Sequence, residues 1–167
     1  ADACADLLAR HDVGVILTGT FRLPTNRHDG YDEPFTLPAR LEAAGVRWCL
    51  ASAGGSFETP HERNLPYHAA IAVAHGLDPA VALRSISLSA AELLGVGDRL
   101  GSLEVGKAAT MFLADGDILE VTTRAQTAWI DGRAIELDDK HKQLDRKYRE
   151  RYRQLREAEG ASAAAGG

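Results

Sequence analysis

The chain has 167 residues, of which 45% are hydrophobic and 26% are charged, and its formal net charge at pH 7 is -5. This balance is typical of a folded globular chain and excludes disorder of the whole. The negative charge gives no reason to expect a nucleic-acid partner, and no apolar run is long enough to span a bilayer. We therefore expect a soluble protein with no nucleic-acid or membrane partner, whose compartment, cytoplasmic or periplasmic, stays open.

Two short apolar runs in the first third of the chain predict parallel strands. Residues 13–17 are rich in β-branched side chains, as in strands that are buried on both faces of a sheet. Val46–Ala51 is a second run of this kind. Each run is followed by a helix pattern, and short turns join helix to strand, which implies right-handed crossovers between parallel strands. The fold class predicted by these residues is α/β.

Helix signals surround these strands. Residues 1–8 show a helix-like pattern, and a second helix is expected to begin at Thr36 or Leu37. Pro38 suits the first turn of that helix, and Gly45 supplies its C-terminal stop. The polar stretches 18–36 and 52–64, which follow the two strands, are therefore connecting loops, and long loops of this type often carry function.

Three further helices are expected after the second loop. Residues 65–75 form a run dominated by Ala, Ile and Val. Asp78 and Pro79 then place a capping side chain and a proline at the start of the next helix. Ser89 and Glu92 have the spacing of a capping box and predict the start of a third.

A strand and a hairpin are predicted after these helices. Residues 109–113 form the strand, and Ala128–Ile130 and Ala134–Ile135 form the two arms of the hairpin. Asp131 and Gly132 between the arms favour a type I′ turn. An isolated hairpin is marginally stable in water, so this part of the chain needs partner strands.

From residue 138 the sequence becomes strongly charged and helical as far as residue 158. Its apolar side chains, spaced by four, four and three residues, are Leu144, Tyr148, Tyr152 and Leu155. Packing of this stripe along the protein surface is favoured over a nucleic-acid-binding arm, because charge runs are usually solvated faces. Residues 159–167 are small and predict a flexible tail.

The cysteines and most histidines have structural explanations. Cys4 and Cys49 lie in a helix pattern and a strand pattern without zinc-site spacing, so we expect reduced core thiols. His68 and His75 are seven residues apart on one predicted helix, which places them on one face but too far apart to share an ion. His75 and His11 suit helix C-termini, where a cation is favoured.

The segment Gly101–Lys107, preceded by residues 93–96 and followed by residues 129–133, resembles the closing segment of an amidohydrolase. Residues 63–67 and 115–117 resemble the imidazolonepropionase-like branch of that superfamily. The resemblance implies the C-terminal portion of a (β/α)8 TIM-type barrel, followed by strands of a small β-sandwich and a charged C-terminal helix.

The implied segments are residues 1–95 for the last βα units and following helices, 96–137 for the sandwich strands, 138–158 for the charged helix and 159–167 for the tail. A complete barrel of this type takes roughly 250 residues. The rest of the barrel is therefore expected from a missing N-terminal segment or from a second copy of the chain, and we expect a homo-oligomer.

The resemblance also implies a chemistry, which is hydrolysis of a carbon-nitrogen bond, other than a peptide bond, in a small-molecule substrate. The family uses a divalent metal, here expected to be zinc, which activates water. Its histidine ligands belong to strands before Ala1, and an aspartate is expected after the last strand. Ala53, Gly54 and Gly55 stand there instead and offer no side-chain ligand. We therefore expect no metal site in this chain and no activity of the chain alone.

Two alternatives stay open for the function and for the loop residues. The loss of the aspartate also fits a non-catalytic binding or scaffold protein. Glu58 and His61 are weak candidates for catalytic groups, against the simpler interpretation of two solvated loop residues. The candidate substrate-binding residues are Arg22, His28, Ser52, Gly54 and Asn64. For Arg22 and His28 an ion-pair network within their own loop is an equal alternative.

Overall fold

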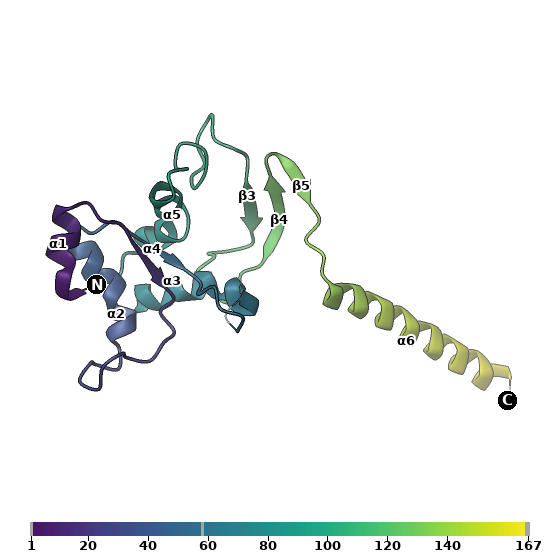
Figure 1. The fold of residues 1–167 in the computed structure, drawn as a ribbon. Coiled ribbons are helices and arrows are strands. Elements are labelled where there is room, and N and C mark those ends of the chain that lie inside the picture. Colours follow the sequence, from purple (N-terminus) through teal and green to yellow (C-terminus); the bar gives the residue numbers. More distant parts are fainter. Residues whose placement is uncertain (1, 58, 166–167) are drawn as a thin grey trace. The chain divides into compact units, whose positions relative to one another are not determined.

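The computed structural model describes residues 2–57 and 59–165, and the chain divides into two compact units, Ala1–Ala134 and Ile135–Gly167. The helices and strands are labelled in Figure 1. In chain order they are a 3-10 helix Asp2–Cys4, α1 (Ala5–Arg10), β1 (Val15–Thr18), α2 (Glu33–Ala43), β2 (Trp48–Ala51), a 3-10 helix Thr59–Asn64, α3 (Leu65–Ala74), α4 (Pro79–Ser85), α5 (Leu88–Leu93), β3 (Met111–Ala114), β4 (Ala125–Ile130), β5 (Arg133–Ile135) and α6 (Lys140–Ala165).

The strands β1 and β2 pair in parallel, as the sequence predicts. Val15 is opposite Trp48, and Thr18 is opposite Ala51, so the two strands end at the same edge. They form a sheet of two strands, and the described residues contain no closed barrel. The α/β class is therefore confirmed.

The first unit buries a core between β2 and the helices that cover it. Leu41 on α2 and Leu50 on β2 are 0% and 2% exposed, and alanines at positions 69 and 72 allow α3 to pack closely. The remaining members of this cluster are Ala5, Leu37, Val46, Trp48, Leu77 and Ala82. These contacts hold the βα layer, which we define as β1, β2 and α1 to α5.

Helix α2 begins earlier than expected. Pro34, not Pro38, occupies its first turn, and Pro38 lies inside the helix. The sequence offers two prolines, and the upstream one starts the helix because its fixed φ suits that position. Gly45 ends α2 as predicted: its φ is 70°, and the Val46 N–H donates to the Leu41 carbonyl at 3.1 Å, as in a Schellman motif.

Helices α4 and α5 give one confirmed and one wrong cap prediction. Asp78 accepts hydrogen bonds from the N–H groups of Ala80 and Val81, so it caps α4 as expected. The capping box predicted at Ser89 and Glu92 is wrong, because α5 starts at Leu88 and Ser87 is its N-cap. Both side chains bind the guanidinium of Arg84 instead, at 2.8 Å.

The turn from Gly101 to Lys107 is held by its own polar side chains. The Ser102 hydroxyl donates to Glu104, and the Lys107 ammonium contacts both residues, so these hydrogen bonds lower the pKa of the Glu104 carboxyl. Gly101 has a φ of 92°, and a Cβ there would lie 2.7 Å from the Leu88 Cα. The turn therefore packs on the start of α5 and requires glycine.

The strands β3, β4 and β5 form an antiparallel sheet with Met111 opposite Trp129. Asp131 and Gly132 both have positive φ, 48° and 77°, so the predicted type I′ turn is confirmed. Phe112 and Leu113 on β3 are 51% and 59% exposed. The sheet is formed as predicted, and these two side chains lie largely open to solvent.

In the second unit, α6 runs from Lys140 to Ala165 and is longer than predicted. Helix replaces the expected flexible tail as far as Ala165, because the end of the chain is rich in alanine, the strongest helix former. Ion pairs one turn apart, such as Asp145 with Arg149 at 2.7 Å, support the charged face. The apolar stripe is exposed, so its packing against another surface stays a prediction.

Cys49 and Cys4 differ in their surroundings. Cys49 is buried on β2, and burial raises the pKa of its thiol, as expected for an inert core cysteine. Cys4 is exposed, so the expectation of a core thiol is wrong there, because the 3-10 helix that carries it lies at the edge of the core.

Across the described residues, no helix has both the length and the apolar character that a membrane crossing requires.

Candidate functional site

A cavity of about 320 Å³ lies where β1 and β2 end. Its walls come from the two loops that follow these strands and from the first turns of α3. The lining residues are Thr18, Gly19, Phe21, Arg22, Ser52, Ala53, His61, Asn64 and His68. Parallel strands direct the loops at their carboxyl ends to one edge, so this is the position expected of a functional site in an α/β fold.

His68 on α3 is the most firmly held polar side chain of this cavity. Its Nδ1 accepts hydrogen bonds from the backbone N–H groups of Thr20 at 3.0 Å and Phe21 at 3.3 Å. The Phe21 ring lies against the imidazole, with centroids 4.6 Å apart. An Nδ1 that accepts two N–H groups carries no proton, so the neutral ring carries its proton on Nε2. Burial lowers the pKa of His68 and favours this neutral form.

His61 lies in the 3-10 helix after β2 and lines the same cavity. Its Nδ1 is 2.9 Å from the carbonyl oxygen of Phe57. A carbonyl oxygen only accepts, so Nδ1 donates, and in the neutral ring Nε2 is left with a lone pair. The two histidines of the cavity therefore have opposite hydrogen-bonding character at Nε2.

The predicted substrate-binding residues separate into two groups. Arg22, Ser52 and Asn64 line the cavity. His28 does not: its side chain is 86% exposed and its Nε2 lies 3.8 Å from Asp29. Gly54 also lies outside the lining, and a Cβ built there meets nothing within 4 Å.

The loop after β1 has ion pairs, but Arg22 takes its partner from α2 and not from the loop acids of the expected network. Arg22 contacts Glu33 at 3.2 Å, and Arg40 reaches the same carboxylate at 3.5 Å. Asp29 accepts from the Asn26 backbone N–H, which lowers the pKa of its carboxyl. The loop is thus tied internally, and the charge of Arg22 is partly neutralised at the cavity wall.

The cavity residues do not fit a metal ion. Ala53 occupies the wall where an aspartate would be expected, and it has no ligand atom in its side chain. Over residues 2–57 and 59–165, no three His, Cys, Asp or Glu side chains come together in a way that would hold an ion. Glu58, the other candidate catalytic group, lies outside the described residues.

His68 and its contacts were missed by the sequence reasoning, which treated it as one of a helical pair with His75. One signal was available. Gly19 and Thr20 directly follow a strand, and glycine there indicates a close approach of another group to the backbone. Gly19 has a φ of 77°, and a Cβ there would lie 3.2 Å from the His68 Cε1.

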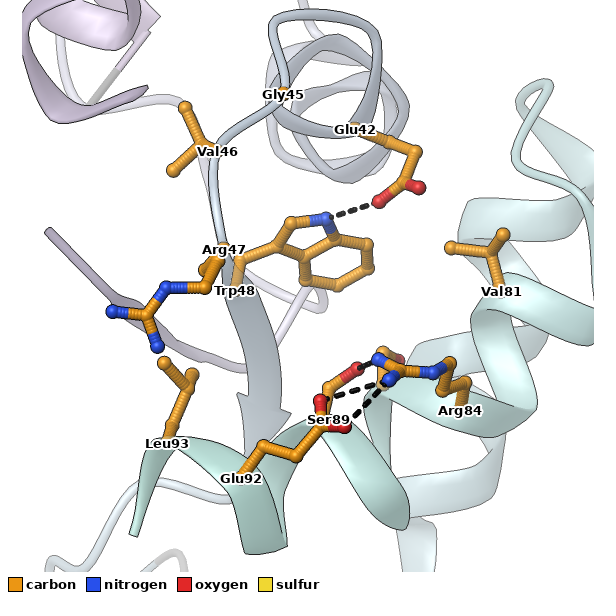
Figure 2. Close-up of a pocket in the computed structure, with 11 residues that line it drawn as sticks. Glu42, Gly45, Val46, Arg47, Trp48, Val81, Arg84, Ser89, Glu92 and Leu93 are labelled. Atoms are coloured by element: carbon orange, nitrogen blue, oxygen red, sulfur yellow. Dashed lines mark hydrogen bonds and ion pairs between the residues drawn. The ribbon is translucent and has the colours of Figure 1, made fainter. Parts of the chain in front are cut away.

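A second cavity, of about 240 Å³, lies near the opposite end of β2 (Figure 2). The Trp48 indole donates to Glu42 at 2.9 Å, and Arg84 is held by Ser89 and Glu92. These polar groups bind one another and leave few hydrogen bonds for a ligand. The cavity at the carboxyl ends of the strands is therefore the better candidate site.

A model of the amidohydrolase family matches residues 2–140. The chain belongs to the amidohydrolase family. Its matched part covers all of the βα layer and the β3–β4–β5 sheet.

Individual amidohydrolases resemble parts of the chain in sequence. An imidazolonepropionase from Aromatoleum aromaticum (strain DSM 19018 / LMG 30748 / EbN1) is 36% identical over 123 residues, which are 72% of this chain and 27% of that protein. The chain therefore spans about a quarter of the length of this relative.

Solved structures of other family members have a similar fold. An amidohydrolase from Thermotoga maritima MSB8 superposes with a TM-score of 0.68 at 23% identity, over 81% of this chain and 34% of that one. An adenosine deaminase from Xanthomonas campestris with bound zinc gives a TM-score of 0.56 at 24% identity, over 92% and 40%. These likenesses support the mixed α/β fold of the family.

Proposed function

We propose that this chain is part of an amidohydrolase-like hydrolase that acts on carbon-nitrogen bonds, other than peptide bonds, in small molecules. One observation carries the proposal. In a member of the amidohydrolase family, a cavity with His61, His68 and Asn64 in its walls lies at the carboxyl ends of two parallel strands. The chain contributes this part of the substrate cavity.

The catalytic metal centre belongs mostly outside this chain. Members of the family use a divalent metal, and zinc is bound in one related structure. Because Ala53 and its neighbours provide no carboxylate, the described cavity residues do not fit that ion. The chain alone is therefore expected to be inactive, and the ligands are expected from the polypeptide that completes the site.

That polypeptide is the N-terminal barrel segment or a second copy of the chain. In the described residues β1 pairs only with β2, and Ile16 on β1 is 52% exposed. An unpaired strand edge with apolar side chains favours addition of further strands. We expect these contacts within a homo-oligomer of the complete protein.

A hydrolysis assay tests the proposed function. The complete protein, which contains this chain and the rest of its barrel, is incubated with a panel of lactams, imidazolones and acyclic amides. We expect weak hydrolysis of cyclic substrates that is lost with a chelator and restored by zinc, and none by this chain alone. Equal activity before and after removal of all metal would contradict the proposal.

A binding or scaffold protein without a metal site is the second candidate. The observation in its favour is the run Ala53, Gly54, Gly55 at the position of the family aspartate. The same assay decides between them. A complete protein that takes up no stoichiometric metal and hydrolyses none of the panel supports the scaffold.

A further inference from the structure

Helix α6 lies beyond the part of the chain that the family match covers. The match ends at residue 140, and α6 begins at Lys140. The side chains of its apolar stripe are between 38% and 60% exposed, and they are Leu144, Tyr148, Tyr152 and Leu155. The part of the chain that is shared with the family therefore does not explain why this stripe is apolar.

The apolar stripe runs straight along α6. Its steps of four, four and three residues average about 3.7, close to the 3.6 residues of a helical turn, so its side chains stay on one line over about 16 Å. A coiled-coil seam alternates steps of three and four, which two successive steps of four do not match. Glu159, about one turn after Leu155, ends the stripe. The four side chains can therefore contact one flat surface together, and a supercoiled partner helix is not favoured.

The charged side chains of α6 are sorted around this stripe. Four cations border it on its two sides, and they are Lys140, Lys147, Arg151 and Arg156. Among residues 2–57 and 59–165, none of these four takes part in an ion pair. On the far face Arg153 binds Glu150 at 2.7 Å and also Glu157. Asp145, an acid beside the stripe, is paired with Arg149 at 2.7 Å. Free positive charge is therefore concentrated beside the stripe.

Charge complementarity decides which surface fits the stripe. Residues 140–159 hold eight Lys and Arg against four Asp and Glu, an excess of four positive charges in a chain whose net charge is -5. A second α6 would bring the same free cations against the first, and facing like charges are unfavourable. A nucleic-acid backbone would use the cations and leave the apolar stripe in water. A bilayer with anionic lipids offers both an apolar interior and negative headgroups.

The types of side chain on this face also suit a bilayer. Tyr148 and Tyr152 each join an apolar ring to a polar hydroxyl, a combination that is favoured where acyl chains meet headgroups. Lys and Arg side chains lay their apolar stems along an apolar surface while their charges reach the phosphates. The bordering cations therefore widen the apolar contact as well as adding attraction.

We propose that α6 lies on the surface of an anionic lipid bilayer, with the apolar stripe at the boundary between headgroups and acyl chains and the four bordering cations against lipid phosphates. The sequence predicts no membrane partner because no run spans a bilayer, but a helix that lies in the interface needs no such run. This contact holds the protein at a membrane surface and leaves the proposed hydrolysis unchanged.

Vesicle flotation of the complete protein tests this contact at about 0.15 M salt. The probes are vesicles of phosphatidylcholine alone and vesicles in which about one-quarter of the lipid is phosphatidylglycerol. We expect the protein to float with the anionic vesicles and to bind the neutral ones at least about 10-fold more weakly. Equal binding to both kinds of vesicle, or binding to neither, would overturn the inference.

Two double variants separate the bordering cations from the other charges of the helix. Arg151→Gln with Arg156→Gln should weaken binding to anionic vesicles by about 10- to 30-fold, because each cation near the surface contributes about 5-fold. The matched control, Arg146→Gln with Arg153→Gln, removes the same charge from the far face. It should weaken binding by about 3-fold or less, since salt screens charges beyond about 10 Å. Gln forms helix about as well as Arg, so α6 persists in both. Equal losses in the two variants would contradict the proposal.

The stripe itself is tested by Leu144→Gln with Leu155→Gln, which keeps every charge. Removal of two apolar contacts should weaken vesicle binding by about 10-fold or more. Unchanged binding, or binding of the parent to a DNA duplex that is as tight as its binding to the vesicles, would mean that the cations act alone and would refute the proposal. A parent that ignores vesicles and forms a dimer which this variant dissociates would assign the stripe to a second copy instead.

Discussion

The βα layer and the antiparallel sheet of the same chain differ in how much of their apolar surface they bury. In the layer, Leu41 and Leu50 are 0% and 2% exposed. In the sheet, Phe112 and Leu113 are 51% and 59% exposed. The layer therefore encloses a core of its own, whereas the sheet leaves large apolar side chains of β3 half exposed. This difference indicates that the buried apolar core resides in the layer, and we expect further polypeptide to cover the sheet.

The largest expected effect comes from restoring a carboxylate to the layer. Ala53→Asp in the complete protein should raise lactam hydrolysis by about 100- to 10,000-fold, the range of general acid-base assistance. Ala53 lies in the cavity wall, and Gly54 next to it has open space for a side chain, so Gly54→Asp is a second variant. Rates are measured by steady-state kinetics.

Asparagine at the same positions is the control, because it has the shape of aspartate without its charge and basicity. No gain with Ala53→Asp or Gly54→Asp, or an equal gain with Ala53→Asn, would mean that the missing aspartate does not limit activity. High activity of the unmodified protein that is abolished by Glu58→Gln or His61→Asn would assign the proton transfer to the loop after β2.

Paired truncations test the difference in burial directly. Leu41→Ala should lower the free energy of unfolding by about 2 to 5 kcal/mol, because it leaves a cavity in the core. Phe112→Ala should change that free energy by about 0.5 kcal/mol or less in this chain, since its side chain is half exposed. Urea denaturation measures both.

The same pair also tests the dependence of the sheet on a partner. In the complete protein, Phe112→Ala should become markedly more destabilising, because partner strands then cover its side chain. A Phe112→Ala effect that is equally small in both proteins would mean that β3 has no partner there.

The smallest expected effect is a pH dependence of stability that belongs to the layer. Burial lowers the pKa of His68, whereas an unfolded histidine titrates at about 6.5. As the pH falls through about 6.5, the unfolded chain takes up this proton and the folded chain does not, so stability present above that pH is lost toward the lower folded pKa.

Urea denaturation at several pH values measures how the free energy of unfolding changes with pH. The pH range, from about 7.5 to 5.5, brackets the pKa of an unfolded histidine. His68→Asn should flatten this pH dependence, whereas His75→Asn, on the same helix, should leave the His68 contribution in place. An unchanged slope in His68→Asn would show that His68 is as easily protonated in the folded protein as in the unfolded chain.

Local signals in the sequence predicted local structure well. The parallel strands, the Asp78 cap and the Asp131–Gly132 turn each depend on residues next to one another, and each is confirmed. The capping box at Ser89 failed because Arg84, on the preceding helix, takes its side chain. Contacts across the fold compete with local ones, and the sequence does not reveal which contact prevails.

The lining of the candidate cavity was predictable in part. Arg22, Ser52, His61 and Asn64 lie in the segments that follow the two strands, and that position brings all four to the wall of one cavity. His68 was missed because its hydrogen bonds join residues 48 positions apart in the chain. Helical periodicity places it on a face, but only the packing of α3 against the end of β1 gives its imidazole a partner.

Metal content is the measurement that tests the central claim most directly, namely that this chain supplies cavity walls while the metal ligands lie elsewhere. After dialysis against zinc and manganese, elemental analysis of the chain alone should find no stoichiometric ion, and the complete protein should retain one. A stoichiometric ion in the chain alone that disappears in His61→Asn or Glu58→Gln would contradict the account and place the metal site in the loop after β2.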